Sequence, residues 1–381
     1  MSLAWADIRH HLVRFFITTA GISLLFTAMI GMIGLYRGVV YETMLIINDV
    51  GADIWLAQGH RVGPFAELSQ IPGSLDRRLE GVPGVIQARR FIQFNQQYEL
   101  DGRRLRIAVT GLDFPKDTGS WVPLAAGRHL YAGHYEAIAD RSLGFVLGEQ
   151  VRLGRDDYTI VGIATGQVDM AGDSILYVTI ADAQSLDTFA PSEAVLLRRA
   201  KKGDSAPTGY AKGRIAAVMA ALRPGADLAQ VKSYIRNWGD VSFLTRDDQE
   251  DIMLNGRLWR LRLQIMAFVI MTLIVTTIVV GLSIYTMTLE KTHQIALLKL
   301  IGARDRVIVA MILEQALLIG IVAFIVAVVH AHYLFPHFPR TVLIVPIDAL
   351  MEGGMALAIC AAASWFGIRK AMSVRAVELL S

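Results

Sequence analysis

The sequence is poor in charged residues and has almost no cysteine. Charged residues make up 19% of the 381 positions, whereas a soluble globular chain usually carries about 25%. Hydrophobic residues make up 54%. The single cysteine, Cys360, cannot form a disulfide within the chain, so the folded parts must be stable through packing alone. This composition points to a membrane protein.

Several kinds of site lack the residues that they need. No G-x-x-x-x-G-K-[ST] phosphate loop occurs, so we do not expect the chain to hydrolyse ATP by itself. A net charge of +3 gives no basic field for nucleic acid. His330, His332 and His337 could hold a metal, and Asp169 and Asp173 could form an acid–base pair. Because no H-E-x-x-H, C-x-x-C or nucleophile accompanies them, the simpler interpretation is that they are ordinary polar residues, and no catalytic, cofactor or metal site is predicted.

Four apolar segments are long enough to cross a bilayer, which takes about 20 helical residues. We expect spans at Leu12–Tyr36, Leu263–Leu289, Val307–Val329 and Pro346–Ile368. The first has a long apolar core with no small-residue cleavage site, which favours an uncleaved anchor over a signal peptide. The expected order is an N-terminal arm and first span (1–39), an outer domain (40–258), a second span with a stalk (259–289), a cytoplasmic helix (290–304), a third span (305–333), a short loop (334–345), a fourth span (346–368) and a tail (369–381).

The short segments that would share one side of the membrane are basic. Cytoplasmic loops carry an excess of Lys and Arg, so both termini and residues 290–304 are expected in the cytoplasm and the outer domain outside it. Arg257, Arg260 and Arg262 are counter-evidence, since they precede the second span on the other side. The basic residues on the expected cytoplasmic side are Arg9, Arg14, Lys291, Lys299, Arg304, Arg306, Arg369, Lys370 and Arg375.

Between residues 40 and 258, glycine, proline and charges return, and the pattern is mixed α+β. Asp101-Gly102 lies between two β-like runs and predicts a hairpin with a type I′ turn. Lys201–Pro207 is expected to be a loop between two subdomains. The expected strands are 52–57, 85–100, 103–110, 158–163 and 175–179, and the expected helices are 74–80, 140–147, 181–187 and 226–237.

A long helix is expected to lead into the second span. Thr245 to Asp248 resembles a capping box, and a helix from there to Leu289 would be about 65 Å long, twice the thickness of the hydrocarbon core. Such a helix would protrude as a rigid stalk and transmit movement. Gly256 is its weak point, because glycine within a helix costs about 1 kcal/mol relative to alanine.

Polar and small residues within the spans suggest contacts. Thr19, Ser23, Thr27 and Gly31 recur every four residues, which allows close helix packing either within the chain or against a second copy. Glu314 lies inside the third span, where an ionisable group is costly. We expect Glu314 to face protein and to bond a hydroxyl such as that of Thr272 or Thr276, with either a structural role or a role in gating or proton-linked motion.

The segment Glu290–Ala303 contains the motif E-K-T-H-Q-I-A-L-L-K-L-I-G-A and is helical in pattern. Ile295, Leu298 and Ile301 would form an apolar face with Lys299 beside it, and Gly302 would end the helix. Two interpretations remain open. The helix could dock into a groove of a soluble partner, or it could be a plain amphipathic helix at the membrane surface.

This segment resembles the loop after the second span in the FtsX-like permeases of the MacB type of ABC transporter. Gln294 stands where the family usually has Glu, and Leu300 where it usually has Ala, so a salt bridge to the ATPase is not implied. Glu314 also matches an acidic position of the family. The matching residues of the motif are Glu290, Lys291, Ile295, Leu298, Lys299, Gly302 and Ala303. Further matches are Gly127-Arg128, Glu136–Ile138, Ser142-Leu143, Leu147-Gly148, Tyr158–Ile163, Arg369–Ala371 and Val374–Glu378.

The resemblance implies a MacB-type ABC permease in the inner membrane, with a periplasmic α+β domain. Its partners would be a separate ATPase that carries the ATP and Mg²⁺, a second permease copy, membrane lipids, and a membrane fusion protein with an outer-membrane duct. The layout is similar to that of DevC-like glycolipid exporters, so the implied activity is efflux of a lipid-like or amphiphilic substrate. A LolC-type lipoprotein-releasing permease and an FtsX-like scaffold that activates a periplasmic hydrolase are the alternatives.

Overall fold

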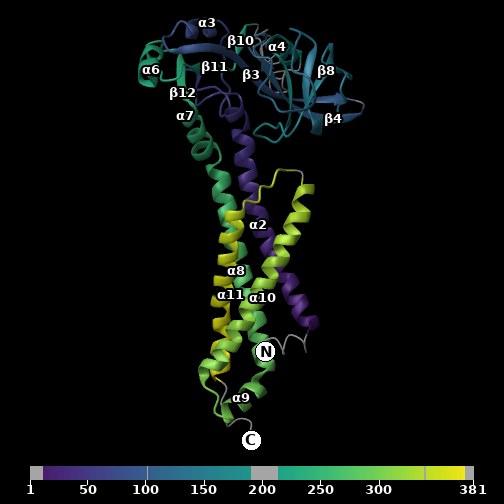
Figure 1. Cartoon of the computed structure of the whole chain (residues 1–381), viewed down its shortest axis with the longest axis vertical. Helices are drawn as coiled ribbons and strands as arrows, with labels where there is room; N and C mark the ends of the chain where they lie inside the picture. The colour runs from purple at the N-terminus through teal and green to yellow at the C-terminus, as the bar shows by residue number, and fades with distance from the viewer. Residues whose placement is uncertain (1–11, 101, 190–212, 339, 374–381) are drawn as a thin grey trace, which may run out of the picture. The chain divides into compact units, whose positions relative to one another are not determined.

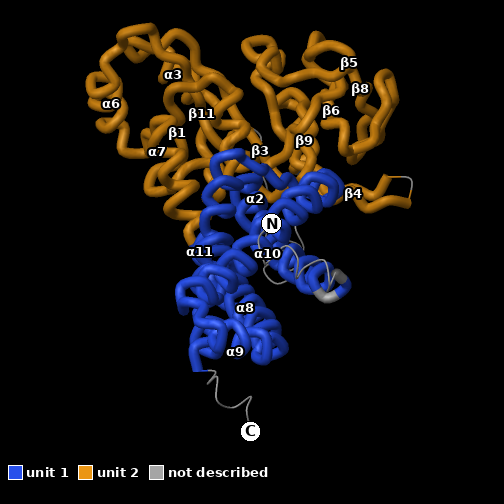
Figure 2. The backbone as a smooth tube through the Cα atoms, turned by 60° about the horizontal axis from the view of Figure 1, so that its bottom comes forward, with its two compact units in different colours: residues 1–39, 260–381 blue, residues 40–259 orange. Residues whose placement is uncertain are grey.

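The computed structural model describes residues 12–100, 102–189, 213–338 and 340–373. The chain divides into two compact units (Figures 1 and 2). The helical unit comprises residues 1–39 and 260–381, and the sheet unit comprises residues 40–259. The expected loop at Lys201–Pro207 and Asp101 of the expected turn lie outside the described residues, as do Arg9, Arg375 and the segment Val374–Glu378.

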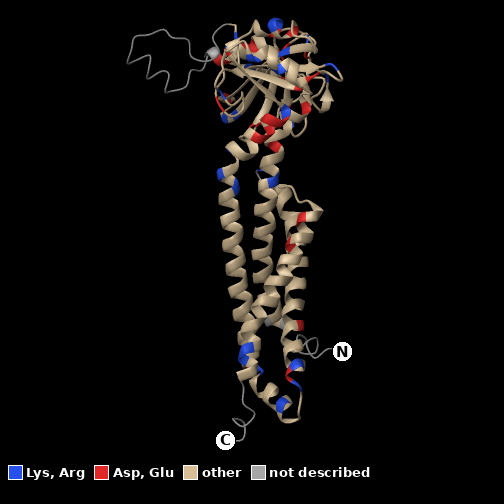
Figure 3. Ribbon diagram, turned by 90° about the vertical axis from the view of Figure 1, so that its left-hand side faces the viewer, with Lys and Arg blue, Asp and Glu red and all other residues tan. Residues whose placement is uncertain are grey.

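Within the described part of the chain, four helices are long and apolar enough to cross a membrane. Charged residues are sparse along them (Figure 3), as expected for helices in hydrocarbon. The predicted class, a membrane protein with four spanning helices and a large α+β domain, is confirmed. The long helices are α2 (Leu12–Asp49), α8 (Trp259–Glu290), α10 (Asp305–Leu334) and α11 (Pro346–Ser373), with the short helices α9 (Thr292–Leu300) and η3 (Phe335–His337) between them.

The sheet unit is built on one ten-stranded mixed sheet in the order β12-β1-β11-β3-β4-β9-β6-β8-β5, with β7 paired to β8. The pairs β4–β9 and β6–β8 are parallel and the others are antiparallel. The strands are β1 (Ile54–Gln58), β3 (Val85–Leu100), β4 (Arg103–Leu112), β5 (Leu124–Gly127), β6 (Glu136–Asp140), β7 (Gln150–Leu153), β8 (Asp156–Ala164), β9 (Ser174–Thr179), β11 (Ala217–Leu222) and β12 (Val241–Thr245). A separate pair joins β2 (Ile71–Pro72) to β10 (Arg214–Ile215).

The strand β3 belongs to both halves of this sheet. Its residues 85–91 pair with β11, and its residues 92–100 pair with β4. Beside the first half, Trp55, Phe65 and Phe91 meet edge to face with ring centroids 5.3–5.5 Å apart, and all three are buried. Such aromatic clusters contribute a large share of core burial.

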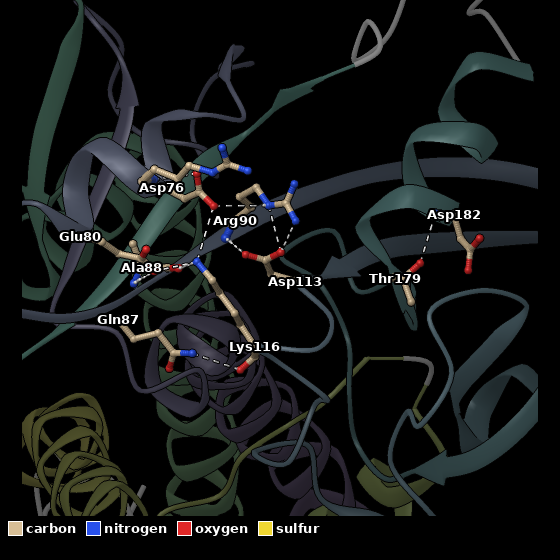
Figure 4. Close-up of polar contacts among 10 residues, drawn as sticks. Asp76, Glu80, Gln87, Ala88, Arg90, Asp113, Lys116, Thr179 and Asp182 are labelled. Atoms are coloured by element: carbon tan, nitrogen blue, oxygen red, sulfur yellow. Dashed lines mark hydrogen bonds and ion pairs between the residues drawn. The ribbon is translucent and has the colours of Figure 1, made fainter.

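An ion-pair network joins α3 (Leu75–Glu80) to β3 and to the loop after β4 (Figure 4). Asp113 accepts hydrogen bonds from the Arg90 guanidinium at 2.5 and 2.9 Å and from the Arg90 backbone N–H at 2.9 Å. Lys116 Nζ lies 2.6 Å from Glu80 Oε1 and 3.6 Å from Asp76 Oδ2. The hydrogen bond from Lys116 lowers the pKa of the Glu80 carboxyl. These contacts hold α3 and the loop after β4 against β3.

Two expectations about helices of the sheet unit are wrong. Residues 140–147 form only the 3₁₀ turn η1 (Arg141–Leu143), because Gly144 follows with a φ of +77° and ends it. The single helix from 245 to Leu289 is interrupted after α7 (Arg246–Asp251) by a π-helical turn, η2 (Ile252–Arg257), and a bend at Leu258. The remaining helices, α4 (Ile180–Phe189) and α6 (Leu228–Arg236), overlap the expected ranges.

The start of the interrupted helix is as expected. Thr245 and Asp248 form a complete capping box, in which each side chain accepts the other residue's backbone N–H, at 3.1 and 2.9 Å. The break follows from backbone geometry further on: the Leu258 N–H donates to Met253 O five residues back, at 2.9 Å. Gly256 lies within this turn. Because glycine has a low α-helix propensity, a departure from the α-helix costs less free energy at this position.

Candidate functional site

The helix α9 has well-defined ends. Helix α8 stops at Glu290, and Lys291 turns the chain before α9 begins at Thr292. At the other end Gly302 has a φ of +90°. The Gly302 N–H donates to Lys299 O at 3.1 Å and the Ala303 N–H to Leu298 O at 3.0 Å, which is the Schellman pattern. The predicted helix stop at Gly302 is therefore confirmed.

One side of α9 is anchored to the helical unit. Ile295 and Ala296 are each 1% exposed, and Ile295 belongs to the core of the helical unit. Lys291 Nζ donates to Gln315 Oε1 at 3.1 Å. Lys299 Nζ donates to the carbonyl oxygens of Ala371 and Met372, at 3.0 and 3.3 Å, near the end of α11. A cation at a helix C-terminus is stabilising, so Lys299 fixes α9 against α11.

The opposite side of α9 is exposed and partly apolar. Leu297 is 45% exposed, Leu300 49% and Ile301 83%. The exposed polar residues that accompany them are Glu290, His293 and Gln294. We name the exposed set His293, Gln294, Leu297, Leu300 and Ile301 the outer face of α9.

The expected apolar face of this segment is partly wrong. Of Ile295, Leu298 and Ile301, the structure buries the first, half-buries the second and exposes the third. Apolar residues surround the helix on most sides, so periodicity could not tell which stripe packs within the protein. The long-range contacts of Lys291 and Lys299 determine which side of α9 packs against the helical unit.

Glu314 does not occupy the expected position. Its side chain is exposed on α10, and the hydroxyls of Thr272 and Thr276 donate to carbonyls of their own helix, at 2.9 and 2.7 Å. The neighbouring Gln315 is buried, at 6% exposed, and accepts the bond from Lys291. Sequence reasoning missed Gln315; the one available signal was a polar amide next to Glu314 in an apolar span.

The small-residue stripe of α2 packs within the chain. Thr19, Ser23 and Thr27 are buried, at 4%, 0% and 5% exposed. The Thr27 hydroxyl lies 3.4 Å from Ala327 O on α10, and the Phe335 ring occupies the space beside Gly31. Of the two interpretations left open, these contacts favour the one in which the stripe packs against a span of the same chain.

The other polar clusters have structural partners. Asn95 Nδ2 lies 2.6 Å from Asp169 Oδ2 and 2.7 Å from Asp173 Oδ2, and Arg106 pairs with Asp173 at 2.6 Å. Burial raises the pKa of the Asp169 carboxyl. His337 Nδ1 lies 3.1 Å from Tyr333 O. Among the described residues, no group of three or more His, Cys, Asp or Glu is placed to hold a metal ion.

Two family models match the chain. One is described as the MacB-like periplasmic core domain and matches residues 15–238, which is more than half of the chain; the other is described as the FtsX-like permease C-terminal and matches residues 266–375. Among curated relatives, an uncharacterized ABC transporter permease of Mycobacterium tuberculosis is 24% identical over 373 residues, 97% of this chain and 96% of the relative. One of Mycobacterium bovis is 23% identical over the same shares.

Two solved structures each match about half of the chain. The periplasmic region of MacB from Actinobacillus actinomycetemcomitans matches 55% of this chain and 96% of its own, with 11% identity and a TM-score of 0.37. The extracellular domain of the noncanonic ABC-type transporter YknZ from Gram-positive bacteria matches 51% of this chain and 100% of its own, with 12% identity and a TM-score of 0.34.

The family models cover most of the sheet unit and most of the spans, including the segment 290–303 whose residues carried the resemblance. The chain therefore belongs to the MacB/FtsX-type family of ABC transporter permeases.

Proposed function

We propose that this chain is the permease subunit that couples ATP hydrolysis on a separate ATPase to movement of its periplasmic domain, and so drives export or extraction of a lipid-like or amphiphilic substrate. The chain is the non-catalytic subunit, and the partner holds ATP and Mg²⁺. Helix α9 lies on the cytoplasmic side and its outer face binds the ATPase. A second permease copy, a membrane fusion protein and an outer-membrane duct complete the assembly.

The single observation that carries this proposal is the two-sided character of α9. Its inner side is fixed by Ile295, Lys291 and Lys299, while Leu297 and Ile301 remain exposed at one end of the helical unit. An exposed apolar set on a short, rigidly held helix suits insertion into a groove of a partner protein. Because Lys299 ties α9 to α11, a push on the outer face would reach the spans directly.

The test replaces exposed apolar residues by aspartate. Leu297→Asp and Ile301→Asp each place a charge where the partner would bury an apolar side chain, so we expect stimulation of the ATPase by the permease to fall at least tenfold, which corresponds to about 1.4 kcal/mol of lost binding. The measurement is ATP hydrolysis by the co-reconstituted pair in liposomes. Leu68→Asp is the matched control, because Leu68 is 68% exposed in the sheet unit.

The alternative, a plain amphipathic helix at the membrane surface, predicts normal stimulation in both variants. Ile295→Asp is not a suitable probe of docking, because Ile295 is buried and the charge would disturb the helical unit itself. Normal stimulation by Leu297→Asp and Ile301→Asp would remove the coupling role of α9.

An apolar groove of about 480 Å³ is lined by residues of α10 and α11. This groove supports the proposal that the substrate is amphiphilic. Its lining includes Ile321, Phe324 and Ile325 from α10 and Gly353 and Gly354 from α11. A groove of this size and polarity within spanning helices suits an alkyl chain. A Cβ atom at Gly354 would meet nothing within 4 Å, so a larger residue at this position begins in open space.

Filling the groove provides the test of substrate class. We expect Gly354→Trp to lower ATP-dependent extraction of a fluorescent phospholipid analogue from liposomes several-fold, because the indole ring would occupy the space of the lipid's alkyl chain. Gly21→Trp on α2 is the control, since Gly21 also has open space around it but does not line the groove. Equal extraction by the two variants would contradict the role of the groove.

A further inference from the structure

The first turns of α11 carry two carboxylates at positions that differ by one helical turn. Asp348 is paired with Arg37 of α2: Arg37 Nη2 donates to Asp348 Oδ1 at 2.5 Å, and the Arg37 Nε–Asp348 Oδ2 ion pair is closer still. The Asp348 side chain is 14% exposed and that of Arg37 is 43% exposed. This pair is therefore open to water on one side.

Glu352 lies one turn further along α11, and its surroundings are different. It is 3% exposed, and its Oε2 atom is buried without a hydrogen-bond partner among the described residues. The next positions on the same face of α11, Ala356 and Cys360, are 0% exposed and apolar. The Glu352 carboxyl thus points into the interior of the helical unit.

The neighbouring helices offer Glu352 little compensation. On its own helix the nearest charged group is Asp348, which repels a second negative charge. Helix α2 brings Arg37, which is already paired with Asp348. Helix α10 contributes Ala323, Phe324 and Ala327 to the same apolar core. A buried carboxylate without a partner is costly, whereas the neutral acid is not, so a proton would remove most of the cost.

Chain connectivity places this site at the end of the helical unit that continues into the sheet unit. Arg37 precedes residue 40, where the sheet unit begins, by three residues. The Arg37–Asp348 pair joins α2 and α11 between Glu352 and that end of the helices. Separation of α2 from α11 would break this pair and admit water, which would hydrate and so stabilise the ionised form of Glu352.

We propose that Glu352 is a proton-binding site of the permease, which is neutral in the described arrangement and releases its proton to periplasmic water when α2 and α11 separate. The ligand is the proton itself, and the O–H bond of the carboxylic acid is the bond that breaks. The Arg37–Asp348 pair controls access to the site. The proposal concerns a group remote from α9 and does not depend on the ATPase.

The first measurement uses infrared spectroscopy of the full-length chain in lipid nanodiscs. The wild type should show a protonated-carboxyl C=O absorption at neutral pH that shifts in D₂O and disappears as the pH is raised. Glu352→Gln should lack this band, and Glu314→Gln should retain it. A wild-type spectrum without such a band, or the same band in Glu352→Gln, would overturn the proposal.

The second measurement uses Cys360 as a reporter, because this buried thiol lies eight residues from Glu352 on the same face of α11. Its reaction with a membrane-permeant maleimide should increase with pH several-fold more in the wild type than in Glu352→Gln, whose identical thiol corrects for its own ionisation. Glu352→Asp retains a carboxyl and should keep the pH response. If Glu352→Gln does not fold, the infrared spectrum of Glu352→Asp is compared with that of the wild type: the protonated-carboxyl band should move to another frequency, and an unchanged band would refute its assignment to Glu352. Equal pH responses in the wild type and in a folded Glu352→Gln protein would refute the coupling of protonation to helix separation.

Discussion

Glu136 at the start of β6 is held by four hydrogen bonds. The Arg128 guanidinium donates to it at 2.5 and 3.1 Å, and the backbone N–H groups of Tyr131 and Ala132 donate at 2.8 and 3.0 Å. Arg128 first, and then the two backbone groups, lower the pKa of the Glu136 carboxyl to about 2. Both residues belong to motifs that carried the family resemblance, but the sequence did not reveal that they pair.

This arrangement predicts a pH dependence of local stability. A carboxyl whose pKa is lower in the folded state stabilises the fold fully above its unfolded value, about 4.3, and the contribution is lost as the pH falls toward 2. At neutral pH, Glu136→Gln should lower the local opening free energy by about 1 kcal/mol, less than the roughly 1.5–3 kcal/mol of a hydrogen bond to a charged group, because Arg128 is half exposed. The variant should lose less stability than the wild type between pH 4 and pH 2.

Hydrogen exchange of peptides that cover residues 124–140 measures this effect. Glu149→Gln is the control, because Glu149 accepts a hydrogen bond from the Val146 backbone N–H at 2.7 Å and forms no ion pair among the described residues. An identical pH profile of exchange in Glu136→Gln and the wild type would contradict the assigned role.

At the scale of elements, the sequence predicted where helices begin and end better than which of their sides is buried. Gly302 and the Thr245–Asp248 box act within a few residues, so the chain itself contains the whole signal. The orientation of α9 depends on contacts with residues 24 and 72 positions away, through Lys291 and Lys299, and no local pattern encodes them. The position of this helix was therefore predictable from the sequence, and the residues on its inner and outer sides were not.

The π-helical turn at Ile252–Arg257 is a similar case. The pattern from 245 onward is helical throughout, and Gly256 was the single warning. A π turn needs one residue more per hydrogen-bonded ring than an α-helix, and tertiary fixation selects it: Arg257 donates to Phe65 O at 2.8 Å, and Met253 is fully buried. Such fixation comes from strands and loops that are distant in the sequence.

At the scale of the whole molecule, composition and segment length were sufficient for the membrane class and the four spans. The order of the strands was not accessible, because β1 pairs with β11 and β12 from the far end of the domain. Antiparallel pairing of this kind depends on long-range burial rather than on local sequence.

The membrane orientation can be tested with a matched pair of cysteines in a Cys360→Ala background. Ile301 and Tyr131 are both 83% exposed. We expect a membrane-impermeant maleimide to label Tyr131→Cys in intact spheroplasts and Ile301→Cys only after permeabilisation, because basic short segments remain in the cytoplasm. Labelling of Ile301→Cys from outside would reverse the proposed orientation and leave the ATPase without access to α9.

The double pairing of β3 has a mechanical consequence for the periplasmic domain. A strand of 16 residues extends about 50 Å, and its ladder would have to break before the two halves of the sheet could part. Arg89 on β3 donates to Val50 O at the end of α2, at 2.6 Å, and pairs with Asp117 at 2.8 Å. A pull on α2 should therefore move the whole sheet as one rigid body and should not separate its two halves.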